Sequence, residues 1–175
     1  GLPVREVRAG EAAKLPAALQ AQACISGQRW QWDGVHFSVW QWQDARDSNQ
    51  DSCVLLVQAN GERLLLTGDL DVSGERAWIN DWQATPVDWL QAPHHGSRTS
   101  SSQALLSTTA PRGVLISRGR YNAFGHPHAQ VMERYRINGI EAFDSAVHGA
   151  LRLRLGAFGE PQGMRSQPRF WRDPS

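Results

Sequence analysis

The feature that most constrains the fold is an Asn60-Gly61 pair placed between two apolar runs, 52–59 and 62–67. Asn-Gly favours the left-handed backbone of a two-residue hairpin turn, so the two runs are predicted to pair as antiparallel strands. Upstream, Asp33-Gly34 divides a stretch in which apolar and polar residues alternate, which predicts another hairpin. The first half of the chain is therefore predicted to contain antiparallel hairpins.

The pattern changes after Asp69, where helical and strand periodicities alternate. Helices are predicted over 73–82, 101–107 and 129–138, and strands over 87–92, 113–117, 140–143 and 149–155. Hairpins followed by alternating helices and strands predict an α/β domain, with a mixed sheet covered by helices. We expect this domain to span 1–155, beginning with a loop or short helix over 1–23. Residues 156–175, which are rich in Gly, Pro and Arg, are predicted to be a C-terminal tail.

The composition excludes several classes of protein. With 175 residues, 41% of them hydrophobic and 20% charged, the chain matches one globular domain rather than a disordered or fibrous protein. The longest apolar runs are strand-sized and far shorter than the roughly 20 residues that a membrane span needs, so the chain is predicted to be soluble. A net charge of +1 argues neither for nor against a nucleic-acid partner.

The two cysteines have no metal-binding or redox spacing. Cys24 and Cys53 are far apart, and neither belongs to a CxxC pair or a zinc-finger pattern. We expect both to be thiols buried in strands, in preference to a disulfide. A disulfide would imply an oxidising compartment, so the cysteines leave the location open.

Three polar clusters stand where apolar strands are predicted to end, and they hold four of the six histidines. They are Thr67-Gly68-Asp69, Pro93-His94-His95-Gly96-Ser97 and Gly125-His126-Pro127-His128. Loops at one edge of a sheet can meet there, so we expect the three clusters to be neighbours. A carboxylate with several imidazoles is the ligand set of a zinc, manganese or iron hydrolase.

Simpler roles compete with this interpretation. Asp69 has the position of a helix cap, and Gly-His-Pro-His is also a common way to begin a helix. The hydroxyls of Ser97 and of residues 99–102 suit either a phosphate or plain capping. His36 and His148 lie in strand patterns and are expected to be ordinary. Most of the eight tryptophans are expected to lie in the core. Two beside a loop, Trp40 and Trp42, are kept as candidates for stacking on bases.

Taken in order, these motifs resemble the C-terminal metallo-β-lactamase-like domain of the ComEC family of competence proteins, over about 110 residues. The resemblance rests on Leu64 to Leu70, Val87 to Ser97, Ser100 to Ser102, Val114 to Ser117, Asn122 and Gly125 to His128. It implies an αββα sandwich, of which this chain is expected to be the C-terminal half. It also implies a metal-dependent nuclease that degrades the DNA strand not taken up.

The resemblance assigns roles to individual residues. Asp69 matches the carboxylate that bridges two metal ions, and chain order points to His126 as the last metal-binding histidine. His94 and His95 resemble catalytic, substrate-side histidines, although this pair could instead supply that last ligand. The remaining matches are expected to contact substrate: Ser97, Arg98, Ser100, Asn122 and His128. A metal-bound hydroxide would attack the phosphodiester, and an imidazole would donate a proton to the leaving oxygen.

One departure from the family is large. The His-x-(His/Asp)-x-Asp-His run that supplies most metal ligands is absent, since no histidine precedes His36. The chain is therefore expected to be part of a longer protein, inactive by itself and without the two divalent ions, Mn or Zn, of the complete domain. A sheet that lacks its partner sheet would expose an apolar face, which would either form homo-oligomers or be covered by the C-terminal tail.

The resemblance also implies partners and a location. The partners would be single-stranded DNA, the rest of a membrane channel protein and other competence proteins. The domain would lie at the bacterial inner membrane, with the periplasmic side favoured. Arg98, Arg118, Arg120 and Tyr121 would contact DNA by charge or stacking whether or not it is cleaved. Two alternatives remain, a non-catalytic DNA-binding or guiding module and a metallo-hydrolase of small esters or lactones.

Overall fold

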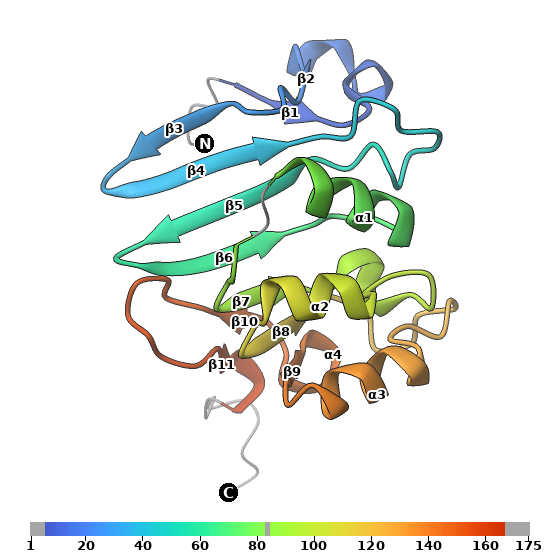
Figure 1. The fold of residues 1–175 in the computed structure, drawn as a ribbon, viewed down its shortest axis with the longest axis vertical. Coiled ribbons are helices and arrows are strands. Elements are labelled where there is room, and N and C mark those ends of the chain that lie inside the picture. The colour runs from blue at the N-terminus through green and yellow to red at the C-terminus, as the bar shows by residue number, and fades with distance from the viewer. Residues whose placement is uncertain (1–5, 83–84, 167–175) are drawn as a thin grey trace, which may run out of the picture.

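A computed structural model describes residues 6–82 and 85–166, which form one mixed sheet with helices packed on it (Figure 1). Seven strands hydrogen-bond in the order in which they occur along the chain. They are β3 (Arg29–Trp32), β4 (Val35–Trp40), β5 (Val54–Ala59), β6 (Glu62–Leu66), β7 (Trp89–Gln91), β8 (Gly113–Ile116) and β9 (Glu141–Asp144). The mixed α/β prediction is confirmed.

The strands from β3 to β6 are antiparallel, and both predicted hairpins are present. Asn60 and Gly61 have φ values of 48° and 86°, and Asp33 and Gly34 have 47° and 79°. These left-handed conformations are the ones that a two-residue turn matching the strand twist requires. The turns fix the register, with Ala59 opposite Glu62, and so set which side chains share a face.

The strands from β6 to β9 are parallel. Each is joined to the next by a segment containing a helix: α1 (Val72–Asp81), α2 (Gln103–Thr109) and α3 (Ala129–Ile137). Parallel strands place all their carboxyl ends at one edge of the sheet. The loops that leave β6, β7 and β8 therefore begin side by side.

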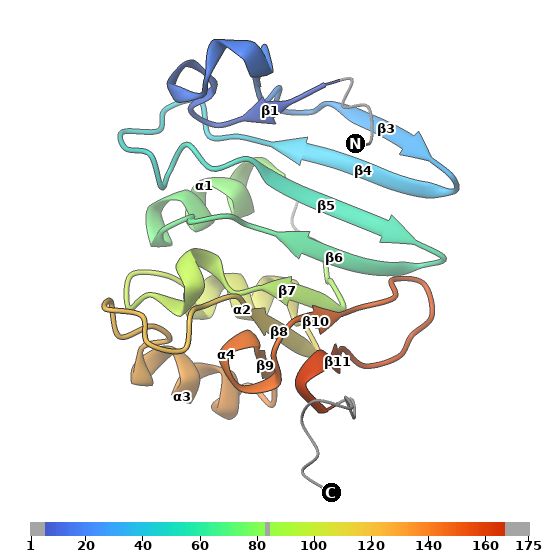
Figure 2. The ribbon, with the colours of Figure 1, turned by 180° about the vertical axis from the view of Figure 1, so that it is seen from behind.

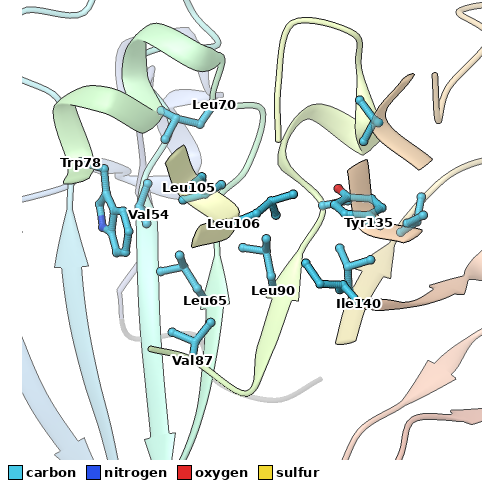
Figure 3. Close-up of a cluster of buried hydrophobic side chains, with 14 of the residues drawn as sticks. Val54, Leu65, Leu70, Trp78, Val87, Leu90, Leu105, Leu106, Tyr135 and Ile140 are labelled. Atoms are coloured by element: carbon cyan, nitrogen blue, oxygen red, sulfur yellow. The ribbon is translucent and has the colours of Figure 1, made fainter. Parts of the chain in front are cut away.

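The hydrophobic core lies between the sheet and these three helices (Figure 3). Leu65, Leu90 and Val114 point from the sheet toward Trp78 of α1 and Leu106 of α2, and all are at most 2% exposed. Because side chains alternate along a strand, their neighbours face the other side. The core therefore joins the sheet to one helical layer, so the described residues form two of the four layers of an αββα sandwich.

The opposite face of the sheet is covered unevenly. Over β7 to β9 it is met by α4 (Ser145–His148), β10 (Leu151–Arg152) and β11 (Gln162–Gly163) (Figure 2). Over β4 to β6 five apolar side chains on this face are only half buried: Phe37, Leu55, Val57, Leu64 and Leu66. The exposed apolar face expected from the sequence is therefore confined to the antiparallel strands.

The start of β6 is held by a buried carboxylate. Glu62 is fully buried and accepts hydrogen bonds from Trp89 Nε1 at 2.8 Å and from the backbone amides of Gly156 and Phe158 at 2.6 and 3.1 Å. Arg112 completes the set with an ion pair. Burial alone raises the pKa of Glu62, but these hydrogen bonds outweigh it and hold the pKa below its ordinary value. The residue thereby fastens the C-terminal segment to the sheet.

Several sequence-based expectations need correction. Cys24 and Cys53 form a disulfide with Cα atoms 6.0 Å apart, so the preference for free thiols was wrong. The strand predicted over 149–155 shortens to β10, which pairs with β11 outside the main sheet, and His148 lies on α4 rather than in a strand. The proposed tail contains β11 and contacts Glu62 within 156–166, while 167–175 lie outside the described residues.

The amino-terminal segment carries two 3₁₀ turns, η1 (Ala12–Lys14) and η2 (Ala17–Leu19). Around them β1 (Arg8–Ala9) pairs in parallel with β2 (Gln22–Ala23). Short η turns also follow β7 and β11, over Pro93–Gly96 (η3) and Met164–Ser166 (η4). Within the described ranges, every helix is too short or too polar to cross a bilayer.

Candidate functional site

Three loops at the carboxyl ends of β6, β7 and β8 lie side by side, as the sequence predicts. The turn η3 follows β7, and its His94 amide donates to Gly68 O of the β6 loop at 3.0 Å. The β8 loop reaches the same place, where the His128 amide donates to Gly96 O at 2.8 Å. Backbone hydrogen bonds therefore connect all three predicted clusters directly.

Asp69 presents a half-exposed carboxylate at this edge. Its backbone amide donates to Ser52 Oγ at 3.0 Å, and the two amides before it donate to Gln91 Oε1. The alternative role as a helix cap is not what the structure shows, since Asp71 caps α1 by accepting from Gly74 N at 2.9 Å. The loop is thus held by its backbone, which leaves the Asp69 side chain for chemistry.

His95 lies between two oxygen acceptors. Its Nδ1 is 2.7 Å from Ser117 O, and its Nε2 is 3.3 Å from Asp69 Oδ1. A carbonyl cannot donate, so Nδ1 carries a proton. With a neutral ring, the Nε2 lone pair then faces the Asp69 carboxylate, so both atoms offer electron pairs to the same place. A carboxylate and an imidazole nitrogen are both common ligands of zinc and manganese, so this pair fits one edge of a metal site.

His94 is held in an unusual conformation. Both His94 and His95 have positive φ values, 48° and 56°, which carry a cost for residues with a Cβ atom. The Nδ1 atom of His94 is buried and has no hydrogen-bond partner among the described residues. Strained backbone and an unsatisfied polar atom are concentrated at functional sites.

His126 brings a third imidazole, with its ring centre 5.6 Å from that of His94. Burial lowers the pKa of His126, and His94, His95 and His128 lower it further, while Asp69 acts in the opposite direction. A lowered pKa keeps the ring neutral at physiological pH, and a neutral ring has the lone pair that metal binding requires.

A buried network behind η3 supports the site, and the sequence analysis did not identify its central residue. Glu75 of α1 is fully buried and accepts from the amide of Ser102 at 2.8 Å and from that of Ser101. Burial raises the pKa of Glu75, although these hydrogen bonds oppose the rise. Arg134 of α3 donates to Ser100 O at 2.9 Å, so two helices brace the loop that follows the histidines. A lone Glu in a helix gives no sequence signal for such a role.

Several of the remaining predicted residues support the loops or cap helices. Ser97 and Ser100 are buried, and the Ser100 hydroxyl donates to Pro93 O at 2.7 Å, so it supports η3 from within. His128 is the N-cap of α3 and accepts from Gln130 N at 3.3 Å, while Ser102 caps α2. These capping roles match the simpler interpretation of both motifs.

Other candidates lie on the solvent side or in the core. Arg98 is exposed, and Asn122 ties its own loop together through His126. Arg118 forms an ion pair with Asp144 at 2.6 Å. Trp40 is 2% exposed and lies in the core, so it is not available for stacking on a base. Trp42 packs against the same core.

The fit to a metal centre is partial. Among residues 6–82 and 85–166, no group of three or more His, Cys, Asp or Glu side chains is arranged to hold a metal ion. Asp69 with one or two of the histidines would supply part of a ligand set. A complete centre needs donors beyond those that the described residues bring together.

Comparison with known proteins places the chain in a family. The sequence profile of the metallo-beta-lactamase superfamily matches residues 25–120. Competence protein ComA of Neisseria gonorrhoeae is 39% identical over 148 residues, which are 82% of this chain and 21% of that protein. Recombination protein 2 of Haemophilus influenzae is 37% identical over 134 residues, 75% of this chain and 17% of that protein.

Other similarities cover less of the chain or share less of its sequence. ComE operon protein 3 of Bacillus subtilis is 30% identical over 111 residues, 63% of this chain and 14% of that protein. Among solved structures, CmlA, a diiron β-hydroxylase from Streptomyces venezuelae, shares 11% identity with a TM-score of 0.45, over 71% of this chain and 33% of that one. The chain spans about a fifth or less of the length of its curated relatives. It belongs to the metallo-beta-lactamase superfamily, in the branch that includes competence proteins of the ComEC family.

Proposed function

We propose that this chain carries part of the active site of a metal-dependent nuclease in a bacterial DNA-uptake system, which hydrolyses the DNA strand that is not taken up. The observation that carries the proposal is the meeting of Asp69, His94, His95 and His126 at one sheet edge, through loops that are hydrogen-bonded to one another. The similarity to competence proteins supports DNA as the substrate.

The residues of this chain have separate tasks in that reaction. Divalent ions, Mn or Zn, would supply an activated water and neutralise charge on the phosphate when they are bound. Asp69 and His126 are the proposed ligands, because one is an exposed carboxylate and the other a neutral imidazole. His95 is held by Ser117 O with its Nε2 facing the site, which suits it to hold a proton near the leaving oxygen.

The proposed location is the periplasmic side of the inner membrane. The Cys24–Cys53 disulfide supports it, since structural disulfides persist in oxidising compartments such as the bacterial periplasm. Single-stranded DNA, the remainder of a membrane channel protein and other competence proteins are the proposed partners. The half-buried apolar face over β4 to β6 is a proposed surface for association with a second copy.

A non-catalytic role in guiding DNA is the second candidate. The observation that favours it is the incomplete ligand set among the described residues. A site that binds metal weakly would still present Arg118, Arg120 and Tyr121, in the loop between β8 and α3, to a DNA strand.

The deciding experiment compares this chain with a protein extended upstream, each with and without Asp69→Ala. Metal content is measured by mass spectrometry, and cleavage of labelled DNA is followed with Mn and with Zn. We expect only the extended protein to bind two ions and cut DNA, and Asp69→Ala to abolish both properties. DNA binding without metal or cleavage in the extended protein would replace the nuclease with the guiding role. Turnover of small esters alone would indicate a different hydrolase.

A further inference from the structure

The loop between β8 and α3 exposes two aromatic side chains beside the histidines. Tyr121 and Phe124 are 91% and 81% exposed, the highest values among the exposed large apolar side chains of the described chain. The two residues are three positions apart in the same loop, and exposed apolar surface of this kind is typical of interaction sites. The same loop carries Arg120, whose guanidinium lies 5.8 Å from the centre of the Tyr121 ring.

The backbone that bears these rings is braced. Asn122 donates through Nδ2 to His126 O at 2.8 Å and accepts from the His126 amide at 3.0 Å through Oδ1. At the other end of the loop, the Arg118 amide donates to Ser145 Oγ at 2.9 Å, and the Arg118 guanidinium pairs with Asp144. Rings held on a braced loop lose little conformational freedom when they bind, which favours affinity.

Phe124 connects this loop to the site. The Phe124 ring stacks on His126, with ring centres 5.9 Å apart and planes at 20°, and His126 in turn lies next to His94. A chain of nucleotides with a phosphate at the histidines would therefore meet Phe124 next. Aromatic faces with a neighbouring arginine are how proteins bind single strands without regard to sequence, because every base has a face that can stack.

We propose that Tyr121 and Phe124, together with Arg120, form a stacking ledge that holds the bases of a single DNA strand next to the histidine cluster. This proposal rests on the proposed nuclease function only in placing a phosphate of the strand at the histidines. Bases in a duplex are already stacked and paired, so the ledge selects single-stranded DNA over double-stranded DNA. A lipid surface also accepts aromatic rings, but it would cover the half-exposed carboxylate of Asp69 close by, and removing a carboxylate from water is costly.

The test is DNA binding by this chain in the presence of a chelator, so that cleavage plays no part. Fluorescence anisotropy is followed with a labelled thymidine oligonucleotide about 12 nucleotides long, the matching duplex and an abasic strand of equal length. We expect Tyr121→Ala and Phe124→Ala each to weaken single-strand binding roughly tenfold. Phe124→Trp should retain single-strand binding. The double variant, which combines Tyr121→Ala with Phe124→Ala, should bind the intact strand as weakly as the unaltered chain binds the abasic strand.

Matched controls separate stacking from charge and from folding. Trp32→Ala removes a ring that is 70% exposed at the opposite edge of the sheet, and it should leave binding unchanged. Arg120→Gln should reduce the dependence of affinity on salt by about one phosphate contact, whereas the aromatic variants should leave that dependence intact. Melting temperatures of all variants verify that the fold persists.

Several results would overturn the ledge. Equal binding by the double variant, or equal affinity for the intact and abasic strands, contradicts base stacking. Loss of binding to phosphatidylserine vesicles with unchanged DNA binding would assign the two rings to a membrane surface. A protein that binds strands through the ledge but never cuts them overturns the nuclease alone, while normal cleavage and DNA binding by the double variant overturn the ledge alone.

Discussion

The two ends of strand β6 place acidic residues in opposite circumstances. At its start, Glu62 is fully buried and accepts from four donors, two of them backbone amides more than 90 positions away in sequence. Just past its end, Asp69 is half exposed and faces His95. The preceding His94 has a buried Nδ1 that finds no hydrogen-bond partner in the part of the chain that the structure describes. Satisfied polar groups in a low-dielectric interior stabilise a fold, whereas unsatisfied ones are concentrated at sites of chemistry. The same strand therefore carries a structural end and, in the proposed function, a reactive end.

The sharpest way to test this difference is to remove the charge from Glu62. Glu62→Gln should lower the free energy of unfolding by about 2–3 kcal/mol, because an NH2 group replaces one buried acceptor oxygen and the negative charge that pairs with Arg112 is lost. Urea denaturation at pH 7 measures the loss. Glu133→Gln on the exposed face of α3 is the control, and it should leave unfolding unchanged. If the two variants unfold alike, the contrast between the ends of β6 fails.

Acid should remove the same stabilisation from the unaltered chain. Because the pKa of Glu62 is lowered on folding, its ionised form stabilises the fold above the ordinary carboxyl value of 4.5 and loses this effect as pH falls through the lower folded value. The gap in unfolding free energy between the unaltered chain and Glu62→Gln should therefore be constant near pH 7 and narrow below about pH 4.5. A gap that widens in acid would assign the opposite direction to the pKa shift.

A smaller effect is expected at the support of the reactive end. Ser52→Ala removes the acceptor of the Asp69 amide and should cost about 1 kcal/mol of stability. In the extended protein it should also weaken metal binding, because the loop that carries Asp69 loses its hydrogen bond to the Ser52 hydroxyl. Thermal melting and metal titration test the two effects separately, and Ser73→Ala at an exposed position of α1 provides the comparison. Unchanged melting would show that solvent replaces this hydrogen bond.

The smallest effect on stability should come from Asp69 itself. Asp69→Ala removes a half-exposed carboxylate whose partner is also half exposed, so unfolding should change by less than about 0.5 kcal/mol. Its proposed cost is to function, through loss of metal and cleavage in the extended protein. A destabilisation as large as that of Glu62→Gln would make Asp69 structural and erase the distinction between the two ends.

Local patterns predicted much of the architecture. Asn60-Gly61 and Asp33-Gly34 placed the hairpins because a turn is decided by a few neighbouring residues. The meeting of Asp69 with the histidines also followed, since the ends of parallel strands share an edge. The hairpins could be predicted because a short segment determines its own conformation, and the shared edge because it follows from the direction of the strands.

Contacts between residues far apart in the sequence could not be predicted from it. Nothing near Glu62 or Glu75 in sequence indicates the distant amides that make their burial tolerable. Free thiols were preferred to the Cys24–Cys53 disulfide, because 29 positions of separation carry no recognisable spacing. Trp40 was kept for stacking because it precedes a polar loop, but its side chain packs into the core and its indole nitrogen contacts Asp81 at 3.3 Å.

That disulfide also bears on the order in which the molecule assembles. It closes a loop containing all of β3 and β4, and Ser52, next to Cys53, holds the amide of Asp69. Cys24 and Cys53 both precede His94, His95 and His126 in the sequence. A chain that emerges from its amino terminus can therefore form this disulfide before those three histidines have appeared. The hairpins are built from contacts that are local in sequence, whereas the parallel strands pair across longer separations, which is in general the slower event.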